Sequence, residues 1–110
     1  MEKILICSAD ESFREIAKEA LGNKHNLILC EDINQCPEII SNTQIQQVIL
    51  DIENQENLND RITDLASKPL RITIVANHKS REKAEEAVLL GASGYLVKPL
   101  KPEAMLSCIK

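Results

Sequence analysis

Short apolar runs alternate with amphipathic helical patterns from one end of the chain to the other. The runs predict strands at residues 3–7, 27–30, 48–51, 72–76 and 95–97. Each run is followed by apolar residues at helical spacing. After the first run these are Phe13, Ile16, Ala17, Ala20 and Leu21, which are expected to form the buried face of a helix. Strands that are apolar on both faces and separated by helices are typical of a covered parallel sheet. We therefore expect an α/β fold, a doubly wound five-stranded parallel sheet with helices on both faces.

The predicted helices carry start and stop signals. Ser12 and Glu15 fit a capping box for the first helix, Asp10 is the alternative cap, and Gly22 is a candidate left-handed stop. Four later helices are also expected, each with its own apolar face. The second has Ile39 and Ile40 after Pro37, and the third has Leu58, Ile62 and Leu65. The fourth lies between Ser80 and Gly91 with Ala84, Ala87 and Val88, and the last has Met105, Cys108 and Ile109. A helix is thus predicted after every strand.

The composition excludes several classes of function. The 110 residues carry 13 basic and 17 acidic side chains, a net charge of −4, and fit a single domain over residues 1–110. A mildly acidic chain whose aromatic residues are Phe13 and Tyr95 lacks the charge and the stacking side chains of a nucleic-acid-binding domain. No apolar run approaches the roughly 20 residues of a membrane-spanning helix, and the N-terminus lacks the pattern of a secretory signal. We therefore expect a cytoplasmic protein that binds neither nucleic acid nor membrane.

The carboxyl ends of the predicted strands are where such a sheet binds ligands. They fall at residues 7–11, 51–53, 76–77 and 98–99. One apolar strand ends there in a carboxylate, Asp51, and the last strand is followed by a Lys-Pro pair. The search for a functional site therefore concentrates on this edge.

Three segments resemble the receiver domain of bacterial response regulators. GASGYLVKPL at 91–100 is similar to the end of that domain, KILICSADESFREIAKEAL at 3–21 to its first strand and helix, and VILDI at 48–52 to the strand that carries the phosphate-accepting aspartate. The segments lie in the family's order, and the resemblance covers nearly the whole chain. It implies a flavodoxin-like sheet with strand order 2-1-3-4-5 and a role in two-component (phosphorelay) signal transduction.

The resemblance assigns roles to four residues. Asp51 falls on the phosphoacceptor, the carboxylate that attacks the phosphoryl group of a histidine kinase or small phosphodonor. Lys98 falls on the lysine that pairs with the acidic site and follows the phosphoryl oxygens. Its bond to Pro99 is cis in the family, a form that costs little only before proline. Tyr95 falls on the aromatic switch residue.

The same register reveals departures from the family. Ser8 and Ala9 occupy the positions of two adjacent acidic residues that hold Mg²⁺, and Ala76 replaces a Ser or Thr hydroxyl that bonds the phosphoryl group. Mg²⁺ requires oxygen ligands, and the Ser8 hydroxyl and the Ala9 methyl group supply almost none of the negative charge that two carboxylates would bring. Asp10 comes one position too late, and we interpret Glu53 as a solvent-facing loop residue. Mg²⁺ binding is therefore expected to be weak or absent.

We accordingly predict an atypical, pseudo-receiver-like domain in which Mg²⁺-dependent phosphorylation is impaired. It is expected to be a protein-docking module rather than an enzyme, with a histidine kinase or a downstream output protein as its partner. The first alternative is a functional receiver phosphorylated on Asp51, with Asp10, Asp51 and Glu53 as metal ligands. The more remote alternative is a phosphocysteine carrier at Cys7. The loop at 8–12 disfavours it, because it has no glycine and carries two carboxylates that would repel phosphate.

The resemblance also implies where partners dock. In the family, the fourth helix, fifth strand and fifth helix carry output and dimer contacts. These elements correspond here to residues 80–90, 95–97 and 103–110. A homodimer through this surface is the expected form of self-association.

The cysteines match no common metal or redox spacing. Cys7, Cys30, Cys36 and Cys108 are separated by 23, 6 and 72 residues, and we expect reduced, buried thiols. The alternative is redox control, because parallel neighbouring strands would bring Cys7 close to Cys30, with Cys36 nearby. The two histidines receive no role, although the loop that carries His78 is expected near Asp51.

Overall fold

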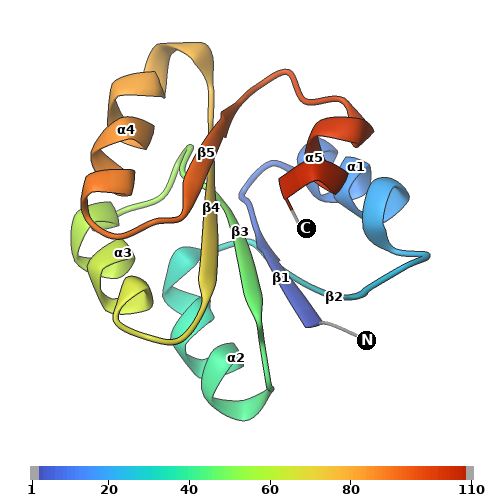
Figure 1. Cartoon of the computed structure of the whole chain (residues 1–110), viewed down its shortest axis with the longest axis horizontal. Helices are drawn as coiled ribbons and strands as arrows, with labels where there is room; N and C mark the ends of the chain where they lie inside the picture. The colour runs from blue at the N-terminus through green and yellow to red at the C-terminus, as the bar shows by residue number, and fades with distance from the viewer. Residues whose placement is uncertain (1–2, 109–110) are drawn as a thin grey trace.

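Five parallel strands form one sheet with the predicted topology. The structure, a computed structural model, describes residues 3–108, the last of them by its backbone alone. The strands are β1 (Lys3–Cys7), β2 (Asn26–Cys30), β3 (Gln47–Asp51), β4 (Arg71–Ala76) and β5 (Gly94–Val97). Their order is β2-β1-β3-β4-β5 and every neighbouring pair is parallel (Figure 1). The α/β, flavodoxin-like fold and the strand order 2-1-3-4-5 are thus confirmed.

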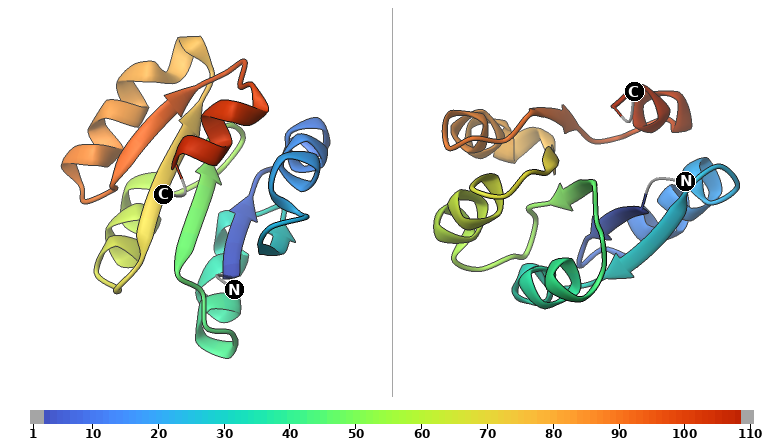
Figure 2. Two further views of the ribbon diagram at one scale, coloured as in Figure 1. Left: turned by 45° about the vertical axis from the view of Figure 1, so that its right-hand side comes forward. Right: turned by 60° about the horizontal axis from the view of Figure 1, so that its bottom comes forward.

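Helices cover both faces of the sheet. They are α1 (Glu11–Leu21), α2 (Cys36–Asn42), α3 (Leu58–Ala66), α4 (Arg81–Leu89) and α5 (Pro102–Cys108), with 3-10 turns η1 (Ile33–Gln35) and η2 (His78–Ser80). Helices α1 and α5 lie on one face, and α2, α3 and α4 lie on the other (Figure 2). No helix within residues 3–108 is both long and apolar enough to cross a bilayer.

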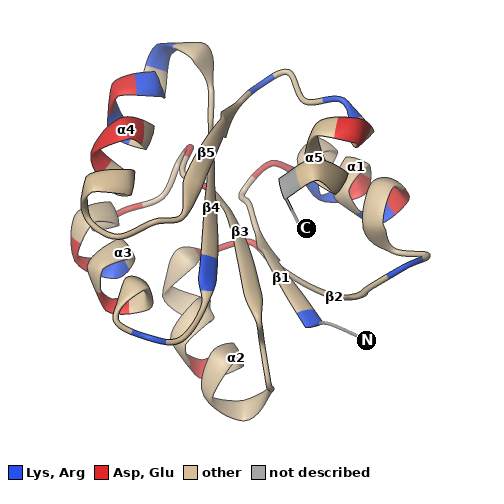
Figure 3. Cartoon of the chain, viewed as in Figure 1, with Lys and Arg blue, Asp and Glu red and all other residues tan. Residues whose placement is uncertain are grey.

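The core consists of two aliphatic layers, one on each face of the sheet. Alternate residues of each central strand enter opposite layers, as Ile4 and Ile6 face α1 and α5 while Leu5 and Cys7 face the other helices. Charged residues lie mainly on the helices and loops, and the strands are almost free of them (Figure 3). Because the central strands are buried on both faces of the sheet, their sequences are continuous apolar runs.

Helix α1 differs in detail from the prediction. Asp10 is its N-cap, because its Oδ1 accepts a 2.9 Å hydrogen bond from the Ser12 backbone N–H, so the Ser12 capping box is wrong. Gly22 has a φ of −62° and is not a left-handed stop. A Cβ at Gly22 would lie 2.5 Å from the Lys18 carbonyl oxygen, so close packing calls for glycine there. Ile16, predicted on the buried face, is 38% exposed.

The later helices follow the predicted order with small corrections. Ile39 and Ile40 are only half-buried, and Cys36 is the buried residue of α2. Gly91, with a φ of +122°, follows the end of α4 as expected. Helix α5 begins at Pro102, one residue before the predicted start. The side chain of Cys108 and all of Ile109 lie outside the described residues.

Candidate functional site

Residues far apart in the sequence meet at the carboxyl edge of the sheet. Asp51 is the last residue of β3 and its side chain is fully buried, at 0% exposure. Lys98 follows β5, and its Nζ lies 2.7 Å from Asp51 Oδ2. Ser8 follows β1 and Ala76 ends β4. Parallel pairing brings these strand ends together because all of them point the same way.

Ser8 contacts Asp51 directly. Its buried hydroxyl donates a 2.6 Å hydrogen bond to Asp51 Oδ2, and its Oγ accepts one of 3.0 Å from the Asp10 backbone N–H. The other Asp51 oxygen, Oδ1, accepts a 3.1 Å bond from the Glu53 backbone N–H. Sequence reasoning treated Ser8 only as a lost carboxylate and missed its role as a donor. The signal was available, since a hydroxyl beside an assigned carboxylate is a hydrogen-bond donor.

The Lys98 ammonium group is held by three side chains. Besides Asp51, it lies 3.5 Å from Asp10 Oδ2 and 5.1 Å from the centroid of the Phe13 ring. Its side chain is 18% exposed, so the cation is largely enclosed by two carboxylates and an aromatic face. The following bond, Lys98–Pro99, is cis. Asp10 thus reaches the site although its sequence position is one residue late.

Glu53 is not a solvent-facing loop residue. It is half-buried, its Oε2 accepts a 3.2 Å hydrogen bond from the Asn77 backbone N–H, and its Oε1 accepts one of 3.1 Å from Ser80 Oγ. The side chain therefore joins the loop after β3 to the loop after β4. The prediction failed because these partners lie 24 and 27 residues away.

The remaining assigned positions lie around this centre. Ala9 is exposed and Ala76 is buried, so neither methyl group offers a ligand. Tyr95 is half-buried, and its hydroxyl lies 3.5 Å from Glu85 Oε1 on α4. Glu85 also lies 3.5 Å from the Arg81 guanidinium group. The aromatic ring is thus associated with α4 rather than with a hydroxyl at the end of β4.

The donor set does not fit Mg²⁺. The ion favours near-octahedral oxygen coordination with one or two carboxylates. Here a hydroxyl faces Asp51 where the resemblance requires an acidic residue, and the Lys98 ammonium group occupies the space between Asp10 and Asp51. The Glu53 carboxylate is engaged by Asn77 and Ser80. The groups at this edge therefore do not match the ligands of a Mg²⁺ site.

The cysteines of the first two strands meet as expected. Cys7 and Cys30 are partners in the β1–β2 register, and the Sγ atoms of Cys30 and Cys36 are 3.9 Å apart. All three are reduced and buried. Hydrogen bonds with Cys30 and Cys36, together with burial, raise the pKa of Cys7. A buried thiol that resists ionisation is a poor nucleophile, which disfavours a phosphocysteine carrier.

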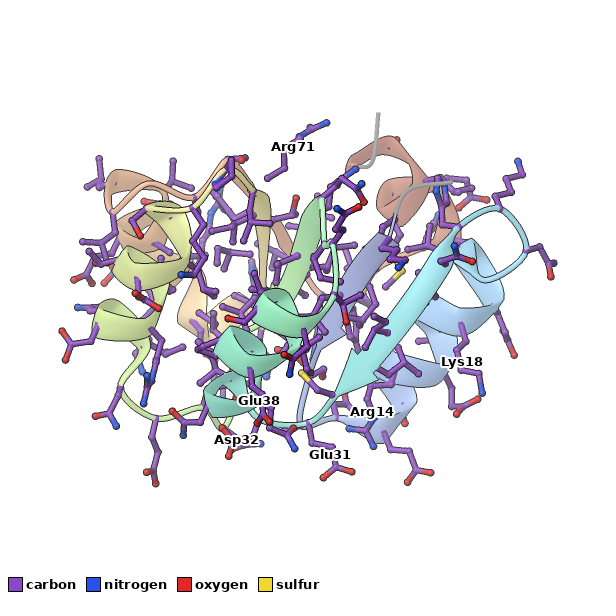
Figure 4. The ribbon with its side chains drawn as sticks, turned by 90° about the horizontal axis from the view of Figure 1, so that it is seen from below. Arg14, Lys18, Glu31, Asp32, Glu38 and Arg71 are labelled. Carbon is purple, nitrogen blue, oxygen red and sulfur yellow. The ribbon has the colours of Figure 1, made fainter. Side chains whose placement is uncertain are left out.

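Sequence reasoning also missed a contact of Arg14. Its Nη1 donates a 2.7 Å hydrogen bond to the Ser8 carbonyl oxygen, and its Nη2 lies 3.5 Å from Glu31 Oε1. Figure 4 shows Arg14 and Glu31 side by side. Arg14 thereby holds the loop between β1 and α1 in place.

An apolar cavity of about 380 Å³ adjoins the Lys98 side of the site. Its lining includes Phe13, Ile16, His78, Lys98 and Leu100. His78 therefore lines a cavity next to Lys98. Because Ile16 is partly exposed, the apolar wall that it forms in this cavity is open to solvent.

The strand order and the helices on both faces of the sheet define a flavodoxin-like α/β fold. Neither a model of a known protein family nor a curated protein matches the sequence. Solved structures do match over nearly the whole chain, and those described below are receiver domains or proteins named as response regulators.

Three of these structures illustrate the likeness. NtrX from Brucella abortus has 20% sequence identity and a TM-score of 0.87; the match covers 99% of this chain but only 26% of that one. A response regulator from Thermotoga maritima has 15% identity and a TM-score of 0.86, over 99% of this chain and 94% of that one. A CheY-like receiver domain protein from Methanospirillum hungatei has 20% identity and a TM-score of 0.86, over 99% and 90%. At these identities the likeness establishes the fold, which is that of response-regulator receiver domains.

Proposed function

We propose that this chain is an atypical receiver domain of a two-component system that docks proteins without Mg²⁺-dependent phosphorylation. One observation carries the proposal. A single oxygen of the assigned phosphoacceptor, Asp51 Oδ2, accepts hydrogen bonds from both Lys98 Nζ and Ser8 Oγ. The charge of the acceptor carboxylate is therefore compensated, and its Oδ2 oxygen is bonded by two donors of the protein itself.

A carboxylate in this state is a poor phosphoryl acceptor. Phosphoryl transfer depends on positioning and on neutralising charge at the transferred group, with metal ions supplying much of that neutralisation. Asp51 is fully buried, its second oxygen accepts from the Glu53 backbone N–H, and the donors around it do not fit Mg²⁺. Attack through Oδ2 would require both of its contacts to break without a metal ion to replace them.

The switching parts of the site support the same proposal. Ala76 offers no hydroxyl that would follow a phosphoryl group. The Glu53 carboxylate joins the loop after β3 to the loop after β4 through Asn77 and Ser80. A phosphorylation-driven movement of the loop after β4 would need a hydroxyl at position 76 to bond the phosphoryl group. It would also need this loop to be free of the Glu53 hydrogen bonds.

The proposed partners are proteins. We assign the docking role to α4, β5 and α5, where Leu89 is 87% exposed, and expect a histidine kinase, an output protein or a second copy of the chain there. The proposal places the domain in the cytoplasm and gives it no enzymatic activity.

Backbone-amide NMR tests the proposal directly. The protein is titrated with Mg²⁺ to millimolar concentration and then with beryllofluoride, a mimic of the acyl phosphate, beside an Asp51→Ala variant. We expect no saturable shifts at Asp51, Ala76 and Lys98 in the wild-type chain. Shifts that appear there only when Asp51 is present would overturn the proposal.

The second candidate is a functional phosphoacceptor receiver. The position of Asp10 favours it, because its Oδ2 lies 3.5 Å from Lys98 Nζ and so places a second carboxylate beside Asp51. Rotation of Lys98 away from both carboxylates would leave two acidic groups for a cation. The same titration distinguishes the candidates, since Asp51-dependent shifts are the expected result for this one.

A further inference from the structure

Three cysteines from three elements bring their sulfur atoms together below the carboxyl edge of the sheet. Cys7 ends β1, Cys30 ends β2 beside it, and Cys36 begins α2. Their Sγ atoms all lie within 4.8 Å of one another. Among the described side chains, no other group of three His, Cys, Asp or Glu residues meets at this spacing.

The cluster is enclosed by the protein. Cys7 and Cys36 are 0% exposed and Cys30 is 7% exposed. All three belong to the aliphatic layer under α2, α3 and α4. Isolated small apolar side chains would fill this layer equally well, so the convergence of three sulfurs on one point calls for its own explanation.

The spacing of the Cys30 and Cys36 sulfur atoms matches a shared metal ion better than a disulfide. Metal–thiolate bonds are about 2.3 Å long, so two sulfurs on one ion lie about 3.8–4.0 Å apart at tetrahedral or trigonal angles. The Sγ atoms of Cys30 and Cys36 are 3.9 Å apart. A disulfide requires an S–S distance of about 2.0 Å, so these sulfurs would have to approach by nearly 2 Å.

We propose that Cys7, Cys30 and Cys36 form a buried thiolate site for a soft metal ion, copper(I) or zinc. Thiolate ligands select these ions over hard cations such as Mg²⁺. Three sulfurs suffice for copper(I), whereas zinc adds a fourth ligand, such as water. Each thiol releases its proton to solvent as its bond to the ion forms. The ion keeps its oxidation state, so no oxidant or reductant is consumed.

Arg14 contacts the residues that follow two of the three cysteines. Three thiolates leave a net negative charge on either ion, and buried charge is costly unless it is compensated. The Arg14 guanidinium group contacts the Ser8 carbonyl oxygen at 2.7 Å and Glu31 at 3.5 Å, and these are the residues directly after Cys7 and Cys30. Its side chain is only 16% exposed. The Arg14 guanidinium group, which lies beside Glu31 in Figure 4, is therefore held next to the chain that follows two of the three ligands.

The site is independent of the proposed signalling role, because it uses none of the residues around Asp51. It is nevertheless adjacent to them, since Cys7 directly precedes Ser8. A bound ion would link the ends of β1 and β2 to the start of α2. Stabilisation of the fold by the ion is therefore an expected readout.

Metal titration of the reduced 110-residue chain tests the site. Copper(I) is added as its acetonitrile complex under anaerobic conditions, and Co²⁺ is added in a separate arm as a spectroscopic substitute for zinc. We expect a sulfur-to-metal charge-transfer band that saturates at one ion per chain, together with a higher midpoint of thermal unfolding. A band that saturates at one ion per chain in either arm supports the site.

Serine variants locate the ligands. Cys30→Ser and Cys36→Ser are expected to lose the band and to weaken binding by more than about tenfold, since even an outer-shell partner is worth about 10–100-fold. Cys108→Ser is the matched control and should bind as the wild-type chain does. X-ray absorption on the metal-loaded wild-type protein counts sulfur ligands without any variant. Three sulfurs support the site; fewer than three, a requirement for Cys108, or no binding in either arm would overturn it.

Discussion

The Ser8 hydroxyl and the Lys98 ammonium group bond the same oxygen of Asp51, at 2.6 and 2.7 Å. The register of the resemblance places an acidic residue at position 8, where its carboxylate would face Asp51 across a cation. The Ser8 hydroxyl instead donates a hydrogen bond directly to Asp51. An acceptor has thus been replaced by a donor, and the negative charge of Asp51 is compensated within the protein.

Removal of the Ser8 hydroxyl should destabilise the fold. In Ser8→Ala, buried Asp51 loses one of its donors, and a hydrogen bond to a charged group contributes about 1.5–3 kcal/mol. We expect the free energy of unfolding in urea to fall by about that amount, with an unchanged m-value. Ser12→Ala, which removes an exposed hydroxyl from the same region, is the control. Equal losses in the two variants would contradict a specific role for Ser8.

Placing carboxylates in the loop between β1 and α1 should create Mg²⁺ binding. Ser8→Asp combined with Ala9→Asp supplies the two missing acidic ligands but crowds Asp51 with negative charge. We expect lower thermal stability without Mg²⁺ and recovery with it, by about 2.7 kcal/mol at a concentration 100 times the Kd. A variant with Asn23→Asp and Asn42→Asp carries the same added charge away from the site and serves as control. Equal responses to Mg²⁺ would mean that nonspecific screening is responsible.

Neutralising Lys98 should be costly. Lys98→Met keeps the aliphatic part of the side chain but leaves the buried Asp51 carboxylate without its cation. Breaking a buried pair costs about 3–5 kcal/mol, and we expect about 2–3 kcal/mol because Lys98 is 18% exposed. Lys101→Met changes an exposed lysine in the same loop and should have little effect on chemical denaturation. A wild-type midpoint for Lys98→Met would show that the ion pair contributes nothing.

The Glu53 bridge should control the mobility of the loop after β4. Glu53→Ala removes the acceptors of the Asn77 amide and the Ser80 hydroxyl. A charge-assisted bond of about 1.5 kcal/mol corresponds to roughly tenfold in an opening equilibrium. Amide hydrogen exchange at Asn77 should accelerate by about that factor. Exchange in Glu56→Ala, an exposed neighbour on the same loop, should match the wild-type rate; unchanged protection in Glu53→Ala would refute the bridge.

Self-association through α4 should depend on Leu89. Its side chain is 87% exposed, and Leu89→Glu places a charge on the proposed docking surface without disturbing the core. Sedimentation analysis should detect a dimer for the wild-type chain and a monomer for the variant, and both should give the same far-UV circular dichroism spectrum. Ile16→Glu alters an exposed apolar residue on the opposite side of the sheet and should leave the dimer intact. A monomeric wild-type chain would refute the homodimer.

The α/β fold was predictable because its signals are local. Continuous apolar runs predicted every strand. The last four strands, β2 to β5, each begin one residue before the predicted start, at Asn26, Gln47, Arg71 and Gly94. The errors lie where a side chain has a choice of partner. Asp10 rather than Ser12 caps α1, and Glu53 turns toward β4 rather than toward solvent. Neither of these hydrogen-bond partners can be predicted from the periodicity of apolar residues in the sequence.

The sequence by itself determined the order of strands and helices and the positions of Asp51 and Lys98 at strand ends, because hydrophobic periodicity and burial act over a few residues. Only the tertiary structure decided which strand-end groups meet. Ser8 and Asp51 are 43 residues apart, and Asp51 and Lys98 are 47 apart. Cys36 reaches Cys30 only through the turn into α2. Such contacts depend on strand pairing and loop geometry, which place distant side chains within hydrogen-bonding or ligating distance.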